Sequence, residues 1–145
     1  MLKVNVIVSD EVSSLFLLSL KRFKKYARDI LKSCDVVSSD VNIIFVNDNA
    51  MASLNEQYKK RKGTTDVLSF LLSEEQGNDV EGEVYISLER AKKQSREYEV
   101  PFEEEIVRLV THGLLHLTGR SHESKEDYTS MVENTEKFIK HYFNQ

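Results

Sequence analysis

Short segments rich in β-branched residues alternate with stretches of helical spacing along the whole chain, and this alternation limits the folds open to it. Residues 3–8, 40–47, 65–72 and 81–87 have the composition of strands. Between and after them, apolar residues recur three or four positions apart, which predicts helices over residues 12–31, 51–58, 88–98, 101–117 and 124–143. The sequence therefore predicts an α+β fold in which a four-stranded mixed sheet packs with about five helices.

Length and composition favour one ordinary globular domain over residues 1–145. A chain of this size buries enough apolar surface to fold without a disulfide or a metal. Cys34 is the only cysteine, so no internal disulfide can form and a reducing compartment is expected. No stretch has the length and apolarity of a signal peptide or a membrane-spanning helix, so we expect a cytoplasmic protein with no membrane contact.

Charge is unevenly distributed, although the net charge is only −4. Residues 1–62 carry 11 Lys and Arg against 7 Asp and Glu, whereas residues 63–145 carry 9 against 17. A basic half beside an acidic half favours a localised anion-binding face. Within the basic half, Lys59, Lys60, Arg61 and Lys62 form an uninterrupted run, which is either a contact for RNA phosphates or a solvated loop.

Three of the four histidines lie close together, at His112, His116 and His122. Residues four apart on a helix share a face, with β-carbons about 6 Å apart, so His112 and His116 can reach one ion. Gly119 favours the left-handed conformation that ends a helix, and the turn would bring His122 back as a third ligand. Three protein ligands leave one position open, which is typical of catalytic zinc sites. The sequence therefore predicts one Zn²⁺ per chain.

Other interpretations of the histidines stay open. They could be ordinary histidines, although imidazoles on so apolar a helix need partners. A structural zinc usually has four protein ligands, and only one thiol exists here. The spacing also matches the zinc-protease pattern H-E-x-x-H-x-x-G-x-x-H, but Gly113 stands where proteases carry the glutamate that serves as general base. A zinc peptidase therefore remains as an alternative hydrolase.

Three blocks of the chain resemble the YbeY family of bacterial single-strand-specific endoribonucleases. Residues 112–122, H-G-L-L-H-L-T-G-R-S-H, are similar to its H-G-x-L-H-L-x-G-Y-D-H. Asn55 and Tyr58, followed by T-D-V-L-S-F at residues 65–70, resemble N-x-x-Y-R and then T-D-V-L-S-F-P. Residues 82–87, G-E-V-Y-I-S, resemble G-D-I-x-I-S, and the blocks occur in the same order at the same distances.

The resemblance implies an α+β fold with a zincin-like metal helix, a zinc site at His112, His116 and His122, and hydrolysis of single-stranded RNA. It also implies a part in 16S rRNA maturation and ribosome quality control, with rRNA and the small ribosomal subunit as partners. The T-D-V-L-S-F strand is expected to run beside the metal helix, where it would align a substrate. The remaining alternative is a ribosome-associated RNA-binding module whose metal only stabilises the fold.

Candidate catalytic residues fall where the chain departs from the family pattern. Lys59 replaces an arginine, with Arg61 close by, and either cation is expected to hold the phosphate. Arg120 and Ser121 replace Tyr-Asp, and Leu71 replaces the proline after T-D-V-L-S-F. Ser121 is thus the candidate for orienting a ligand or helping to activate water, a role in which a hydroxyl is weaker than a carboxylate.

Overall fold

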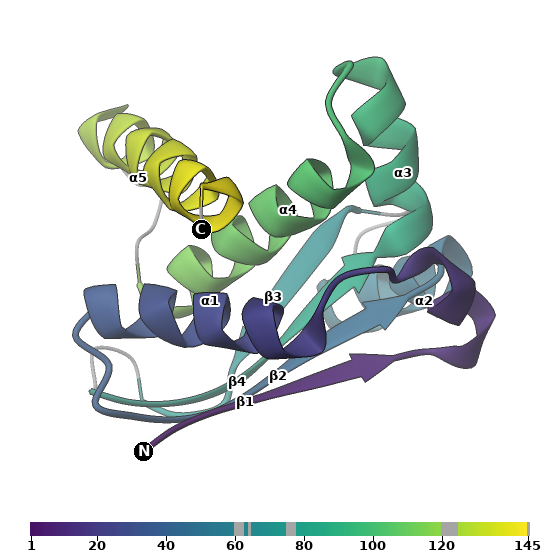
Figure 1. Ribbon diagram of the computed structural model, residues 1–145. Coiled ribbons are helices and arrows are strands. Elements are labelled where there is room, and N and C mark those ends of the chain that lie inside the picture. Colours follow the sequence, from purple (N-terminus) through teal and green to yellow (C-terminus); the bar gives the residue numbers. More distant parts are fainter. Residues whose placement is uncertain (60–62, 64, 75–77, 120–124, 145) are drawn as a thin grey trace.

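Four strands and the first helices make up the first 97 residues, and two longer helices complete the chain (Figure 1). The computed structural model describes residues 1–59, 63, 65–74, 78–119 and 125–144, without the side chains of residues 59 and 125–132. Within these residues, no helix is long and apolar enough to cross a membrane. The elements in chain order are β1 (Leu2–Val8), a 3-10 helix η1 (Asp10–Leu15), α1 (Leu20–Ser33), β2 (Ser38–Val46), α2 (Asp48–Lys59), β3 (Val67–Leu71), β4 (Asp79–Ser87), α3 (Leu88–Glu97), α4 (Phe102–Leu117) and α5 (Lys125–Phe143).

The four strands form one mixed sheet in the order β1-β2-β4-β3. β1 and β2 are parallel, as are β2 and β4, whereas β3 runs antiparallel to β4 at the edge. The register pairs Val4 with Val41, Ile43 with Val84 and Leu68 with Tyr85. The predicted α+β class and mixed sheet are thus confirmed, and the strand bounds agree with the sequence prediction to within two residues.

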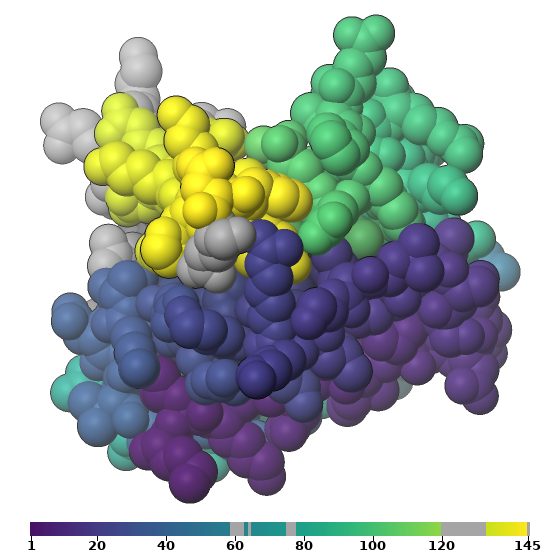
Figure 2. Space-filling model, in the orientation of Figure 1, coloured from purple at the N-terminus to yellow at the C-terminus, as the bar shows by residue number. Residues whose placement is uncertain are grey.

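Helices cover the two faces of the sheet unequally. α1 and α4 lie on one face, and α5 lies against α4 on the side away from the sheet (Figure 1). The end of α5 also rests on α1 (Figure 2), where the Arg22 guanidinium carbon lies 4.1 Å from the centroid of the Tyr142 ring. On the opposite face, α2 covers a smaller core made by Val46, Met51 and Leu68. Most of the buried apolar side chains therefore lie between the sheet and α1 and α4.

One continuous helix over residues 12–31 was predicted, but the chain forms η1 and α1 with a break between them. Phe16 has extended backbone angles, φ −93° and ψ 102°. Its ring packs on Phe23 and Phe45, with centroids 6.0 and 4.9 Å away. Ser19 then begins α1, because its hydroxyl accepts a 3.4 Å hydrogen bond from the Arg22 backbone N–H. Aromatic packing and a new cap thus override the helical spacing.

Candidate metal centre

α4 carries two of the three predicted ligands, and its sequence explains where it begins and ends. Pro101 precedes its first turn, where three glutamates face the positive end of the helix dipole. At the other end, the Thr118 hydroxyl donates to the Leu114 carbonyl at 3.0 Å. Gly119 follows with φ +86°, which confirms the predicted left-handed residue. The helix therefore ends directly after the second histidine.

His112 and His116 lie one turn apart near the C-terminal end of α4. Almost every other side chain in this half of the helix is buried, yet His112 is only half-buried and His116 is exposed. Two imidazoles on one face, open to solvent, suit an ion that a substrate must reach. The negative end of the helix dipole also favours a cation at this position.

The other predicted site residues lie mostly outside the described part of the chain. His122, Arg61 and Ser121 are not among the described residues. Lys59 is the last residue of α2 rather than part of a loop, and its side chain is not described. Among the described residues, no three His, Cys, Asp or Glu side chains are grouped so that they could hold a metal ion. The three-histidine site therefore remains a prediction.

Gly113 brings the backbone of α4 against the sheet. The Ser69 hydroxyl on β3 donates to the Gly113 carbonyl at 3.0 Å, so the T-D-V-L-S-F strand does run beside this helix. A Cβ atom at position 113 would lie 2.5 Å from Val84 Cγ1 and 3.3 Å from Val67 Cγ2. Because Val84 is fully buried, there is no room for the glutamate that zinc peptidases carry at this position. The geometry therefore weighs against the peptidase alternative.

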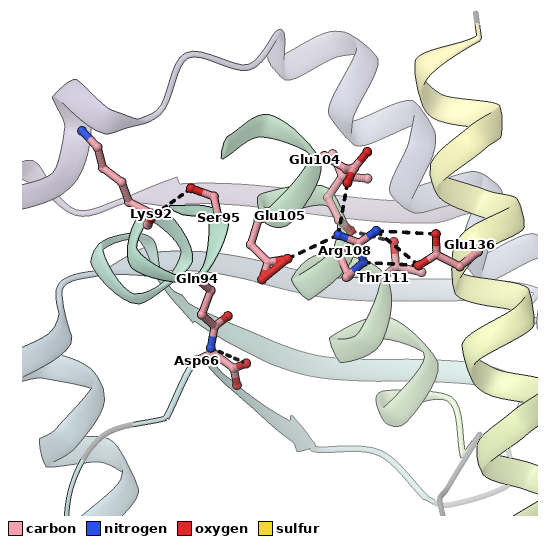
Figure 3. A network of polar contacts seen from close by, with 10 residues as sticks. Asp66, Lys92, Gln94, Ser95, Glu104, Glu105, Arg108, Thr111 and Glu136 are labelled. Atoms are coloured by element: carbon pink, nitrogen blue, oxygen red, sulfur yellow. Dashed lines mark hydrogen bonds and ion pairs between the residues drawn. The ribbon is translucent and has the colours of Figure 1, made fainter. Parts of the chain in front are cut away.

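Asp66 fixes the chain where it enters β3. Its backbone carbonyl accepts from the Ser87 N–H at 3.0 Å. Its carboxylate accepts from the Gln94 amide at 3.3 Å (Figure 3) and from the Thr65 hydroxyl at 3.4 Å. The strand beside α4 is thus tied to both β4 and α3 at its first residues.

An ion-pair network that the sequence analysis did not identify joins α4 to α5. Arg108 lies one turn before His112 and contacts Glu104 and Glu105 on its own helix, at 3.4 Å each. Its other two nitrogens, Nε and Nη2, contact Glu136 of α5 at 3.3 and 3.2 Å (Figure 3). Glu105 is only 2% exposed, and this burial raises the pKa of its carboxyl although Arg108 opposes the change. The positions of Glu104 and Glu105, four and three residues before Arg108, could have predicted these two ion pairs from the sequence.

The stability of a Glu105→Gln variant relative to the wild type is expected to rise with pH. Below the ordinary carboxyl pKa of 4.5, folded and unfolded chains are both protonated, so Glu105 then contributes no penalty. Above it, the unfolded chain ionises first, and the wild type loses stability relative to Glu105→Gln until the pH passes the raised folded pKa. Thermal unfolding from about pH 4 to about pH 8 measures this difference.

Glu104→Gln is the matched control, because Glu104 contacts the same arginine but its side chain is 28% exposed. The difference in unfolding free energy between Glu104→Gln and the wild type should vary less with pH than that of Glu105→Gln. If the stability of Glu105→Gln relative to the wild type stays constant or falls as the pH rises, the raised pKa of Glu105 is contradicted.

Comparison with known proteins places these features in one family context. Residues 8–143 match the sequence pattern of the family described as Endoribonuclease YbeY. A protein of that name from Carboxydothermus hydrogenoformans is 41% identical over 99 residues, which cover 68% of this chain and 69% of the relative. One from Flavobacterium psychrophilum is 33% identical over 79% of this chain and 81% of its own length. A solution structure from Thermotoga maritima superposes with a TM-score of 0.70 at 29% identity, covering 97% of this chain and 89% of the other.

Proposed function

This chain belongs to the YbeY family, and from that premise we propose that it is a zinc-dependent endoribonuclease acting on single-stranded RNA. The relatives compared above are named endoribonucleases. The observation that carries the proposal is the pair His112 and His116, which lie one turn apart and reach solvent from the otherwise buried C-terminal half of α4. Neutral imidazoles are common zinc ligands, and the pair leaves room for a further ligand and a substrate.

The proposed reaction assigns separate roles to the zinc ligands, the phosphate-binding cations and the contacts that fix α4. His112, His116 and His122 would hold zinc, which when bound supplies a Lewis acid that polarises a water molecule or a phosphate oxygen. Lys59 or Arg61 would hold the phosphate of the scissile bond. The contact between Gly113 and β3 and the ion pairs of Arg108 fix α4, so that the two imidazoles of the helix are oriented before substrate binds.

We further infer that the substrate is ribosomal RNA. The family resemblance supports a part in 16S rRNA maturation and ribosome quality control in the cytoplasm, with the small ribosomal subunit as a partner. The run from Lys59 to Lys62 supports binding to a phosphate backbone. Mapping of the 16S rRNA ends in cells lacking the protein, and co-sedimentation with small subunits, test these inferences.

Zinc removal is expected to abolish cleavage. Protein purified without an affinity tag should contain about one zinc per chain, and chelation should remove both the metal and cleavage of a single-stranded RNA. Added zinc should restore cleavage, and a duplex of the same sequence should be cut far more slowly. Elemental analysis and gel analysis of labelled RNA measure these outcomes.

The outcomes separate the alternatives. Metal-free protein that cleaves at the full rate would refute zinc dependence. Metal loss that lowers only the melting temperature and RNA binding, in a protein that never cleaves, would indicate the RNA-binding module with a structural metal. Cleavage of casein instead of RNA would indicate a peptidase, which the space around Gly113 disfavours.

A further inference from the structure

Three aromatic side chains, which we call the aromatic row, lie on the sheet face opposite α4. Tyr58 comes from the last turn of α2, Phe70 from β3 and Tyr85 from β4. The ring centroids of Tyr58 and Phe70 are 5.6 Å apart with an interplanar angle of 69°. Those of Phe70 and Tyr85 are 5.8 Å apart at 80°. Three consecutive elements of the chain thus bring their rings into one continuous contact.

The aromatic row is anchored at one end and open at the other. Phe70 and Tyr85 are half-buried and pack on the small core beneath α2, which includes Met51. Tyr58 is 58% exposed, so its ring adds little to that core. Edge-to-face contacts of this kind hold rings in defined orientations. The row therefore presents a preformed aromatic surface to solvent at Tyr58.

β3 connects the aromatic row to the candidate metal centre. The hydroxyl of Ser69 bonds to the Gly113 carbonyl, beside His112. Phe70 is the next residue, about 3.3 Å further along the strand, and points to the opposite face. Because β3 is at the edge of the sheet, the two faces meet along this one strand. A chain that crosses this edge can touch both the helix side and the aromatic row.

We propose that the aromatic row is a stacking surface for unpaired bases of the RNA substrate. The inference rests on the proposed function and adds the place where bases outside the scissile bond are held. Every base has a π-face, so stacking on tyrosine and phenylalanine binds single strands without requiring a sequence. Paired bases are stacked on their neighbours and cannot occupy the row, which gives the site a preference for single-stranded RNA.

Charge around the aromatic row sets the course of the phosphates. The Tyr85 hydroxyl donates to Glu83 at 3.3 Å, so a carboxylate stands at the inner end of the row and repels a phosphate there. At the other end, Tyr58 is followed directly by Lys59, the last residue of α2. The RNA backbone is therefore expected to pass by Tyr58, with its bases directed toward Phe70.

Binding of single strands with and without bases tests the aromatic row. The probes are short labelled deoxynucleotide strands, which a ribonuclease does not consume, either intact or with abasic internal positions. Wild-type protein should bind the intact strand at least about fivefold more tightly than the abasic one. Tyr58→Ala should lose that preference while its affinity for the abasic strand stays unchanged. Tyr58→Phe keeps the ring and should bind like the wild type.

Tyr98→Ala is the matched control, because Tyr98 is 63% exposed but lies at the end of α3. It should bind both strands like the wild type. In RNA cleavage, Tyr58→Ala should raise KM about fivefold or more with kcat nearly unchanged. Equal affinity of Tyr58→Ala and wild type for the intact strand, or an equal loss in Tyr98→Ala, would overturn the stacking surface. A wild-type protein that binds by bases but never cleaves RNA would instead contradict the proposed function.

Discussion

His116→Ala is expected to lower the rate of RNA cleavage by more than about a hundredfold and to remove the bound zinc. Loss even of the groups that orient a ligand typically costs about 10- to 100-fold in affinity or activity, and loss of the ligand itself should cost more. Because His116 is exposed on α4, the substitution removes no buried packing and the apoprotein should stay folded. Zinc content, circular dichroism and single-turnover cleavage measure the three expectations.

The control for this variant is His141→Ala, which changes an exposed histidine in the last turn of α5. It should retain both zinc and cleavage. A folded His116→Ala protein that cleaves RNA at the wild-type rate would remove the basis of the enzymatic proposal. Loss of zinc with full activity would show that the histidines bind a metal without using it.

Gly113→Ala is expected to destabilise the fold by about 1–3 kcal/mol, the usual cost of forcing an extra carbon into a packed site. The new Cβ would lie 2.5 Å from Val84 Cγ1, and valine in a central strand has little rotamer freedom. The better helix propensity of alanine, about 1 kcal/mol, offsets only part of this cost. For a chain of this size, thermal unfolding should shift by roughly 2–4 °C for each kcal/mol.

A double mutant isolates the cause of this effect. In a Val84→Ala background the methyl group that meets the new Cβ is gone, so Gly113→Ala should cost much less there. Gly113→Glu, which restores the protease motif, should be less stable than Gly113→Ala and should not cleave peptides. Equal costs of Gly113→Ala in both backgrounds would show that contact with Val84 is not the source of the strain.

The sequence was most informative where local pattern decides structure. Strands of alternating β-branched residues and the spacing of His112 and His116 required only their own segments, and both are found as predicted. The break between η1 and α1 was missed because residues 16–18 fit the helical pattern. Contacts of Phe16 with Phe45 on another element decide the break, and no local signal shows them.

The surroundings of the histidines depend on register between distant segments. Sequence comparison showed that Gly113 replaces a protease glutamate, but not that Val84 on β4 fills the space beside it. In the same way, Tyr58, Phe70 and Tyr85 are unremarkable aromatics until the pairing of β3 with β4 brings them together. These features follow from strand pairing across the sheet, which a single sequence does not specify.

The close approach of α4 to the sheet at Gly113 also limits how such a chain can evolve. An ancestor with a glutamate between the two histidines would have needed a residue smaller than valine at position 84 on this backbone. A change between the zinc-peptidase and the endoribonuclease pattern therefore requires substitutions at both position 113 and position 84, which are nearly thirty residues apart. A glutamate at position 113 alone gives a clash, and a smaller residue at position 84 alone gives a void.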